Sequence, residues 1–342
     1  MPKSSPTIYE VARHAGVSIA TVSRVQRGHA QVADATRARV ARSIIELAYR
    51  PSPNARSLAA DRHEATGIVF PNLSGPYYSE VIYGFEREAV QARQSVLILG
   101  THGRDGAEEL VHDLAARVDG LLILGRTVSD RVVEALGRQG MPIVLLARSA
   151  VATADTVRAE NRKAARDLVA HLFEHGRNDL AFVGDPNASH DVSERWAGFL
   201  EAHSSAGRPR PRDPLVIDFT ESGGHATVSV LLRDTPDAGL PDALVCANDE
   251  IALGARRAAR DARIDIPDRI AITGWDDIPA AALVTPALTT VRQPMRELGA
   301  TAAALLTERI SAGRRTPRHV LLPTTPVYRA SCGCHPNGGA IS

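Results

Sequence analysis

The stretch Thr7–Val25, TIYEVARHAGVSIATVSRV, decides the fold of the first part of this chain. Thr7 and Glu10 have the Thr-x-x-Glu spacing of a capping box, which predicts that a first helix begins here. Gly16 tolerates the left-handed backbone of a turn and ends that helix. Ser18 then caps a second helix. Two short helices joined by a turn that contains glycine form a helix-turn-helix, whose second helix enters the major groove of DNA.

The second helix has one face for the protein and one for DNA. Val22 and Val25 point back at the first helix, so Ile19, Ala20, Ser23 and Arg24 are left facing outward. Arg24 is suited to bind a guanine edge through two hydrogen bonds, whereas Ile19 and Ala20 offer only methyl contacts to thymine. Two short helices and a glycine also occur in proteins that bind no DNA, so this motif needs independent support.

The charge distribution gives that support. Residues 1–62 hold ten basic side chains (Lys3 and nine Arg) and four acidic ones, a formal charge of +6 in a chain whose total is +1. The remaining residues therefore carry −5. A basic head on an acidic body is typical of a protein whose attraction to phosphates is confined to one module.

A third amphipathic helix is expected over roughly Asp34–Ala48, with Val40, Ile44 and Leu47 at spacings of four and three. A short helix follows over Pro53–Ala60, with Ser52 at its N-cap and proline at its first position. Because so short a helix is unstable alone in water, it is interpreted as a hinge that folds on DNA. Leu58 either wedges between base pairs from the minor groove or is an ordinary buried leucine.

The rest of the chain alternates short apolar runs with helical stretches, which predicts parallel sheets covered on both faces. The predicted strands are residues 67–70, 96–99, 120–124, 143–146, 180–183, 215–217, 243–246 and 270–273. Eight such strands are more than one doubly wound sheet usually holds, so two subdomains are expected.

The chain has 342 residues, no run of eighteen apolar residues and a polar N-terminus, so neither a membrane span nor a secretory signal is expected. Its three cysteines favour a reducing, cytoplasmic location.

These features together resemble the lactose-repressor (LacI) family of bacterial transcription regulators. The similarity runs from Thr7 through the hinge residues Ala55-Arg56-Ser57-Leu58, and continues with ERWAGF (194–199), PDALVCANDEIALGA (241–255), ITGWDDIP (272–279) and LTTVRQP (288–294). It covers nearly the whole chain in order. There are departures: Gln26-Arg27-Gly28 replaces a frequent Leu-Asn-Gly, Ala33 stands at a cap where Ser is frequent, and Ala48 stands where Gly is.

The resemblance implies an all-α helix-turn-helix head with a hinge helix, followed by an α/β periplasmic-binding-protein-like core of two Rossmann-like subdomains. The expected boundaries are a head at 1–50, a hinge at 51–64, an N-subdomain at 65–160 plus about 290–322, and a C-subdomain at 161–289 plus about 323–335. Three crossover strands near Glu160, Leu288–Arg292 and Val320–Pro323 join the subdomains. The DNA-binding residues are expected to be Thr7, Ser18, Ile19, Ala20, Thr21, Ser23, Arg24, Arg27, Asn54, Ala55, Arg56 and Leu58.

Ligands of open parallel sheets sit beyond the carboxyl ends of the strands. Arg195, Asn248, Asp276 and Gln293 follow such strand ends, and all four match family positions that touch the effector. One arginine, one acid and two amides suit adjacent hydroxyls, and Tyr77, Tyr78 or Phe219 is suited to cover an apolar sugar face. Purely structural roles stay open for several of these residues. Asn248 and Asp276 are also suited to cap helices, and Tyr77 and Tyr78 to begin one.

Two departures bear on the ligand. Ala147 stands where sugar-responsive relatives often carry Asp, and Asp191 where Ser or Thr is frequent. The effector's identity is therefore left open.

Other chemistry has weaker signals. His171-Leu-Phe-Glu-His175 has the letters of an inverted zinc-protease helix, but its apolar spacing is that of an ordinary helix, and Cys332-Gly-Cys334 alone is too small a set for a zinc site. No phosphate-binding loop or nucleophile elbow occurs, so no catalytic residue, metal or cofactor is expected. A carbohydrate-processing enzyme fused to a DNA-binding head, and an architectural protein whose core only dimerises, are the alternatives.

The favoured function is a sequence-specific repressor whose operator affinity is controlled by a small molecule, a sugar, bound between the core lobes. Its expected partners are a near-palindromic operator, the effector and a second copy of the chain in a homodimer, with no membrane. Induction or corepression, the operator sequence, and dimer or tetramer are left open.

Overall fold

The computed structural model describes residues 6–26, 31–49, 62–71, 75–101 and 104–334. The chain divides into two units, Met1–Glu64 and Ala65–Ser342, which are described separately. Within the described residues no helix is both long enough and apolar enough to cross a membrane.

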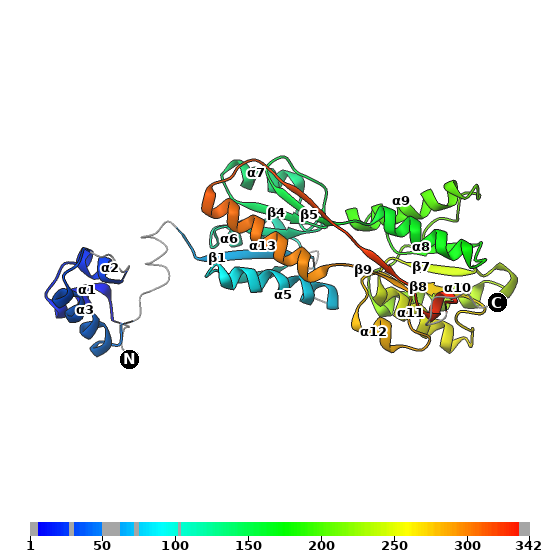
Figure 1. Cartoon of the computed structure of the whole chain (residues 1–342), viewed down its shortest axis with the longest axis horizontal. Helices are drawn as coiled ribbons and strands as arrows, with labels where there is room; N and C mark the ends of the chain where they lie inside the picture. Colours follow the sequence, from blue (N-terminus) through cyan, green and yellow to red (C-terminus); the bar gives the residue numbers. More distant parts are fainter. Residues whose placement is uncertain (1–5, 27–30, 50–61, 72–74, 102–103, 335–342) are drawn as a thin grey trace. The chain divides into compact units, whose positions relative to one another are not determined.

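The first unit contains the helices α1 (Ile8–Ala15), α2 (Ile19–Gln26) and α3 (Asp34–Glu46), drawn in blue in Figure 1. The predicted capping box is confirmed: the Thr7 N–H donates to Glu10 Oε2 at 2.7 Å, and the Glu10 N–H donates to Thr7 Oγ1 at 3.4 Å. Gly16 ends α1 with a φ of 63°. A small core of Val11, Ala12, Ala15, Val22, Val40 and Tyr49 holds the three helices together.

The third helix is shorter than predicted, because it ends at Glu46 with Leu47 as its C-cap. Ala48 then adopts a φ of 49°, in the left-handed region that favours glycine. At the other end, Ala33 supplies no side-chain hydrogen bond to the helix. Both ends of α3 are therefore made by residues that are poorly suited to cap a helix.

The second unit begins with a six-stranded sheet in the order β10-β5-β4-β3-β1-β2. All of its strand pairs are parallel. Its strands are β1 (Ala65–Phe70), β2 (Ser95–Gly100), β3 (Leu121–Leu124), β4 (Ile143–Leu146), β5 (Asp155–Ala159) and β10 (His319–Leu322).

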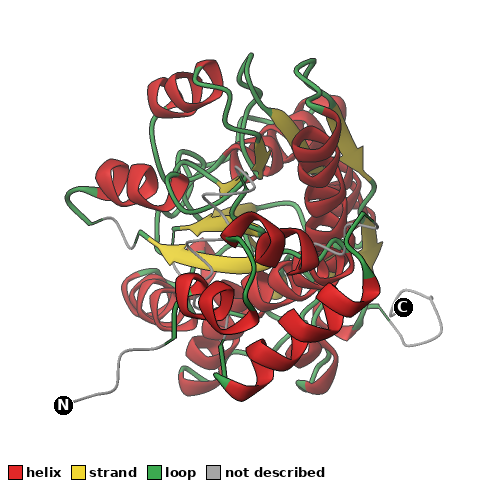
Figure 2. Cartoon of the chain, turned by 90° about the vertical axis from the view of Figure 1, so that its left-hand side faces the viewer, coloured by secondary structure: helices red, strands yellow, loops and turns green. Residues whose placement is uncertain are grey.

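Helices cover both faces of this sheet (Figure 2). Helices α5 (Pro76–Gln91) and α13 (Met295–Ala312) pack on one face, against Ile68, Leu122 and Val144. Helices α6 (Ala107–Ala115) and α7 (Asp130–Arg138) pack on the other, against their neighbours Val69, Ile123 and Leu145. Alternate residues of buried strands thus serve two cores. α5 and α13 approach so closely that a Cβ at Gly84 would lie 1.9 Å from the Arg296 carbonyl oxygen.

A second, three-stranded parallel sheet has the order β6-β7-β8. Its strands are β6 (Leu180–Val183), β7 (Ala243–Cys246) and β8 (Ala271–Thr273), and its helices are α8 (Arg162–Glu174), α9 (His190–Ser205), α10 (Glu221–Asp234), α11 (Asp249–Asp261) and α12 (Pro279–Leu283). An antiparallel pair links β9 (Thr290–Arg292) to β11 (Thr325–Val327), and two short 3-10 turns are η1 (Asp237–Gly239) and η2 (Ala330–Cys332).

One predicted strand is absent: residues 215–217 form no strand, and Leu215 makes only an isolated bridge to Val183. β5 was not among the predicted apolar runs, because its sequence, DTVRA, starts with an acid; only the family resemblance placed a crossover strand near Glu160. Asp155 is nevertheless fully buried, since it accepts hydrogen bonds from Arg309 at 2.9 Å and from Arg314 at 3.1 Å, both far along the chain. The division into two lobes and a hinge at the predicted boundaries stays a proposal.

Candidate functional site

A cavity of about 510 Å³ lies in the second unit, beyond the carboxyl ends of the strands. Its size suits a small organic molecule. All seven residues predicted to bind an effector line it: Tyr77, Tyr78, Arg195, Phe219, Asn248, Asp276 and Gln293. Leu124 and Ala147 lie at the ends of β3 and β4 in the six-stranded sheet, and Asn248 follows β7 in the three-stranded sheet. Both sheets therefore contribute to the wall of the cavity. Residues from distant parts of the sequence thus meet at the strand ends, where ligands of open parallel sheets bind.

Asp276, three residues after β8, is one polar centre of this cavity. It is buried, and its Oδ1 accepts a 2.6 Å hydrogen bond from Gln293 Nε2. Burial raises the pKa of Asp276 to about 6, although the nearby Arg195 guanidinium and the Gln293 amide act in the opposite direction. The residue has a φ of 115°, which side chains other than glycine rarely adopt. Strained backbone of this kind concentrates at ligand sites.

Arg195, on α9, is held rigidly by its own hydrogen bonds. Its Nε donates to Asn161 Oδ1 at 2.8 Å and its Nη1 to the Ala247 carbonyl at 2.6 Å. The guanidinium also stacks on the Trp275 ring, 4.5 Å from its centroid. Two of its three nitrogens are therefore committed within the protein, which fixes the guanidinium in the wall of the cavity.

Asn248 has two roles. It caps α11, because its Oδ1 accepts from the Ile251 N–H at 2.9 Å, so the structural alternative raised from the sequence is correct. Asn248 Nδ2 lies 3.5 Å from the Phe219 carbonyl, and both residues line the cavity. Tyr77 and Tyr78 likewise begin helix α5 and line the cavity, with their rings edge to face at 5.4 Å.

Three polar atoms in the cavity wall are buried without a hydrogen-bond partner: Tyr77 Oη, Asp191 Oδ1 and Gln293 Oε1. Burial raises the pKa of Tyr77 well above its usual value and also raises that of Asp191, because the charged forms are disfavoured there. A buried polar group without a partner costs about 1–3 kcal/mol. All three atoms belong to side chains that line the cavity, so its wall holds polar groups whose hydrogen bonds the protein itself does not complete.

Four charged residues of the wall were not predicted as ligand contacts: Arg126, Asp191, Asp218 and Glu250. Arg126 and Asp218 directly follow the predicted runs 120–124 and 215–217, apart from one glycine, so the strand-end rule was able to indicate them. Asp191 was noted only as a departure from the family pattern. Glu250 stands next to Asn248–Asp249, and its sequence position alone resembles that of an ordinary first-turn acid.

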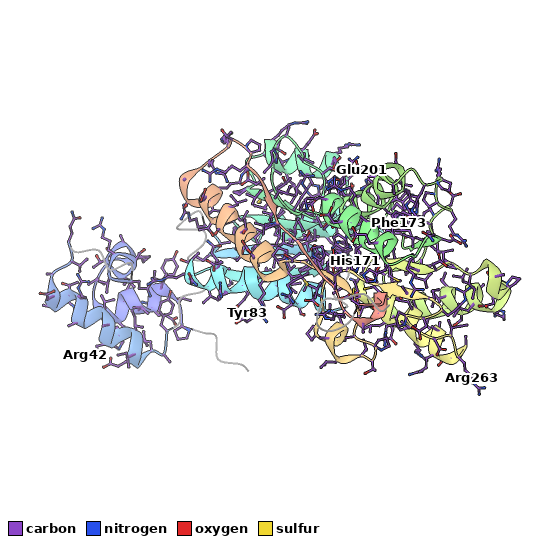
Figure 3. The ribbon with its side chains drawn as sticks, turned by 45° about the vertical axis from the view of Figure 1, so that its right-hand side comes forward. Arg42, Tyr83, His171, Phe173, Glu201 and Arg263 are labelled. Atoms are coloured by element: carbon purple, nitrogen blue, oxygen red, sulfur yellow. The ribbon has the colours of Figure 1, made fainter. Side chains whose placement is uncertain are left out.

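The first unit carries the predicted DNA-binding face. Ile19, Ala20 and Arg24 are exposed on α2, and Val22 is fully buried as predicted. The hydroxyls of Ser18 and Thr21 lie 2.9 Å apart at the start of α2, where the Thr21 N–H donates to Ser18 Oγ at 3.2 Å. Arg42, on α3, is exposed elsewhere on the unit (Figure 3).

The remaining predicted positions of this face vary in what the structure describes. Thr7 Oγ1 donates to Glu10 Oε2 at 3.0 Å as part of the capping box, and Ser23 is partly exposed. Arg27, Asn54, Ala55, Arg56 and Leu58 lie outside the described residues.

Comparisons with known proteins agree with this arrangement. A family described as bacterial regulatory proteins, lacI family, matches residues 7–52, and a periplasmic binding protein-like domain matches residues 169–332. Catabolite control protein A of Priestia megaterium is 32% identical over 331 residues, 95% of this chain and 98% of the relative. A lac repressor dimer bound to operator and the anti-inducer ONPF superposes with a TM-score of 0.84 at 27% identity, covering 96% of this chain and 99% of that one. A complex of the transcriptional regulator CelR with cellobiose has a TM-score of 0.71 at 30% identity, covering 95% and 99%.

Proposed function

The chain belongs to the lacI family of bacterial regulatory proteins, which makes it a DNA-binding transcriptional regulator, and we propose that a neutral sugar in the 510 Å³ cavity sets its affinity for operator DNA. The observation that carries this proposal is that Tyr77, Asp191 and Gln293 line the cavity and that each keeps a buried oxygen without a hydrogen-bond partner. Hydroxyl groups both donate and accept, so a polyol pairs with a phenol, a carboxyl and an amide at once. An apolar ligand leaves all three unpaired.

The charge of the wall favours a neutral sugar over a phosphorylated one. Four carboxyl groups, those of Asp191, Asp218, Glu250 and Asp276, line the cavity with only two guanidiniums, those of Arg126 and Arg195. A phosphate in this setting meets more negative than positive charge. The rings of Tyr77, Tyr78 and Phe219 supply apolar surface for the flat face of a sugar ring.

We further propose that the chain acts as a homodimer that binds a near-palindromic operator. The predicted DNA-binding residues of α2 would read one half-site in the major groove, and Asn54, Ala55, Arg56 and Leu58 of the hinge would contact the centre from the minor groove. The lac repressor that this chain resembles is a dimer on its operator. Because the proposed target is operator DNA inside a bacterial cell, we assign the activity to the cytoplasm.

Effector and operator are linked if the sugar prefers one closure of the two proposed lobes, since closure would shift the spacing of the hinges. The sugar either weakens or strengthens operator binding. Operator affinity measured with and without the sugar gives the direction of the effect. We propose no turnover of the sugar. Binding without any change in the sugar distinguishes this regulator from the alternative, a carbohydrate-processing enzyme with a DNA-binding head.

A thermal-shift panel tests the proposal. The full chain is mixed with neutral mono- and disaccharides, cellobiose among them, and with their phosphorylated forms, with and without operator selected from random duplex DNA. We expect at least one neutral sugar to raise the unfolding temperature, and to change that shift when operator is present. Stabilisation by phosphorylated sugars alone would contradict the neutral-sugar assignment. Conversion of the sugar into a chemically different product would favour the carbohydrate-processing enzyme.

A further inference from the structure

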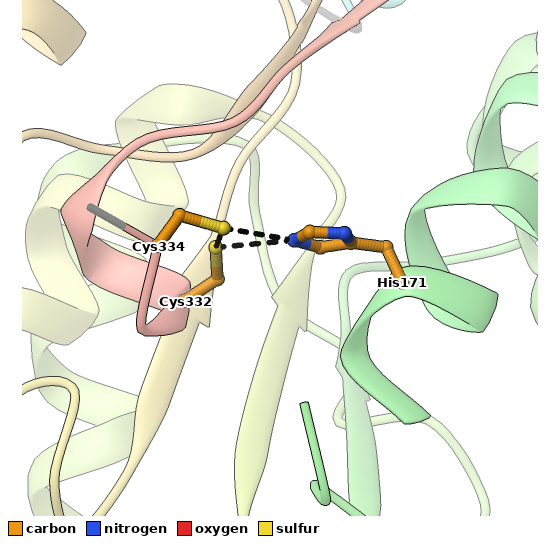
Figure 4. A group of neighbouring side chains, drawn as sticks. All are labelled: His171, Cys332 and Cys334. Atoms are coloured by element: carbon orange, nitrogen blue, oxygen red, sulfur yellow. Dashed lines mark hydrogen bonds between the residues drawn. The ribbon is translucent and has the colours of Figure 1, made fainter. Parts of the chain in front are cut away.

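Two histidines and two cysteines that are far apart in the sequence lie close together at the end of α8. His171 lies in the last turn of this helix, and His175 is its C-cap residue, one turn later. Cys332 ends the 3-10 turn η2, and Cys334 follows it by two residues. In Figure 4 the His171 ring points at both sulfur atoms. Residues about 160 positions apart thus form one cluster of two imidazoles and two thiols.

The ligand atoms of this cluster are close together. His171 Nε2 lies 3.1 Å from Cys334 Sγ and 3.5 Å from Cys332 Sγ, and the two sulfurs are 3.2 Å apart. These three atoms all lie within 4.8 Å of one another. On the other side, His175 Nε2 is 3.5 Å from Cys334 Sγ.

The separations among His171, Cys332 and Cys334 are close to those of three ligands of a tetrahedral metal site. With metal–sulfur bonds near 2.3 Å and metal–nitrogen bonds near 2.0–2.1 Å, the edges of such a tetrahedron measure about 3.3–3.8 Å. The four known pairs, at 3.1–3.5 Å, need to lengthen by at most about half an ångström. His175 contacts Cys334 alone among the cysteines, so it completes the set by a movement of its ring toward Cys332 and His171. Two imidazoles with two thiolates form a set that favours zinc over hard cations such as magnesium or calcium.

Neighbouring groups hold the ligands in this arrangement. His171 stacks on the Tyr328 ring at 3.9 Å, which fixes the plane of the imidazole. The turn between the cysteines depends on Gly333, whose φ of 100° is a conformation that glycine adopts readily. Ser331 anchors the turn in the core, because its Oγ donates to the Ile272 carbonyl at 2.6 Å. The cluster is therefore presented by rigid elements on both sides.

We propose that His171, His175, Cys332 and Cys334 bind one Zn²⁺ ion in a closed tetrahedral site that joins α8 to the C-terminal turn. On binding, each thiol releases its proton to solvent and becomes a thiolate, while both imidazoles coordinate through Nε2 in their neutral form. All four positions are taken by protein atoms, so the ion has a structural role and does not activate water. Such an ion fastens the turn that follows β11 to the first helix after β5.

The competing possibility is a disulfide between Cys332 and Cys334, whose sulfurs face each other. A disulfide consumes both thiols and leaves the two histidines without a metal-binding partner. Metal binding instead needs both thiols reduced and uses both histidines. The two possibilities therefore predict opposite effects of reduction and of histidine substitution.

The test is a Co²⁺ titration of the full chain after reduction and removal of metals with a chelator. We expect one Co²⁺ per chain, with the ligand-field absorption of tetrahedral cobalt and a thiolate-to-cobalt charge-transfer band, and displacement by Zn²⁺. Cys332→Ser, Cys334→Ser, His171→Ala and His175→Ala should each weaken binding roughly tenfold or more, and the double cysteine variant should abolish the charge-transfer band. Two controls, Cys246→Ser in β7 and His112→Ala on α6, remove a thiol and an imidazole elsewhere and should change nothing.

Three results would overturn the site: no Co²⁺ binding by the reduced wild type, a spectrum without thiolate bands, or binding that the histidine variants leave unchanged. Cys332 is fully buried, so its variants are checked by circular dichroism. His175 is partly exposed, and its substitution removes a ligand without opening the core. A folded His175→Ala protein that binds Co²⁺ as tightly as wild type contradicts the four-ligand site.

Discussion

The carboxyl group of Asp276, just after β8, accepts a 2.6 Å hydrogen bond from the side-chain amide of Gln293, just after β9. This contact joins two segments that both line the cavity, and it leaves Gln293 Oε1 buried without a partner. The pair thus fixes two polar side chains in the wall of the cavity. Burial of the charged Asp276 carboxylate destabilises the folded protein, and the first prediction follows from this effect.

Asp276→Asn should stabilise the protein at alkaline pH. Burial raises the folded pKa of Asp276 from 3.8 to about 6, so folding favours the protonated form, and this stabilisation is lost as pH rises through about 6. Asparagine is neutral and keeps the oxygen that accepts from Gln293. The free energy of unfolding of the variant should therefore exceed that of wild type at about pH 8, with the difference vanishing below about pH 4.

Asp277→Asn is the matched control. The Asp277 carboxylate accepts from Arg292 Nε and Arg329 Nη2, both at 2.7 Å, so removing its charge should destabilise the protein at the same pH. Urea unfolding of both variants across the pH range measures the contrast. If Asp276→Asn were also destabilised at about pH 8, attraction to Arg195 would outweigh the effect of burial.

Arg195→Ala should weaken binding of the sugar by more than roughly tenfold, since a hydrogen bond from a charged donor contributes about 1.5–3 kcal/mol when buried. Operator affinity without effector should not change, because Arg195 lies in the second unit. Calorimetry with the sugar found in the panel measures the first effect and fluorescence anisotropy with operator the second. Arg162→Ala, an exposed arginine on α8, is the control. Equal sugar affinity in both variants would contradict the site.

Arg24→Ala should cost about 1–3 kcal/mol of binding to the cognate operator and much less on random DNA. The reason is that Arg24 is exposed on α2 and suited to bind a guanine edge. Arg42→Ala, which removes an exposed charge from α3, should weaken both kinds of DNA by similar, smaller amounts. Competition titrations with operator and random duplexes separate these effects. Equal losses on both DNAs would make Arg24 a phosphate contact.

Leu58→Ala should weaken operator binding and reduce DNA bending, while the unfolding temperature of the second unit and its affinity for sugar stay the same. A pyrimidine–purine step such as CG is expected at the operator centre, because such steps unstack most easily. Gel mobility of circularly permuted operators measures the bend. Normal binding and bending by the variant would contradict the hinge assignment.

Sequence patterns predicted the strands whose residues are uniformly apolar. β4, β6 and β7 occur at the predicted residues, because a short apolar run in a parallel sheet is buried on both faces. The apolar pattern did not indicate β5, which only the resemblance placed near Glu160, because the charge of Asp155 is neutralised by Arg309 and Arg314, more than 150 residues later. No local pattern contains that pairing.

The cavity shows the same division. The strand-end rule and the family resemblance together indicated seven of the residues that line it, since backbone direction follows from the alternation of strands and helices. It gave no sign that Asn248 also caps α11 or that Asp191 Oδ1 is left unpaired. Likewise, the His171–Cys334 contact joins a motif that was interpreted as an ordinary helix to a cysteine pair that was too small a set to interpret alone. Such facts depend on distances between segments, which spacing along the chain does not contain.

The most direct test of the central claim is a paired titration: sugar affinity with and without operator, and operator affinity with and without sugar, on wild type and Asp276→Ala. Linkage between two sites is reciprocal, so the account predicts that each ligand changes the other's affinity by the same factor in the wild type. Asp276→Ala should keep operator affinity and lose its response to sugar. A wild type that binds sugar with no change in operator affinity would contradict the account.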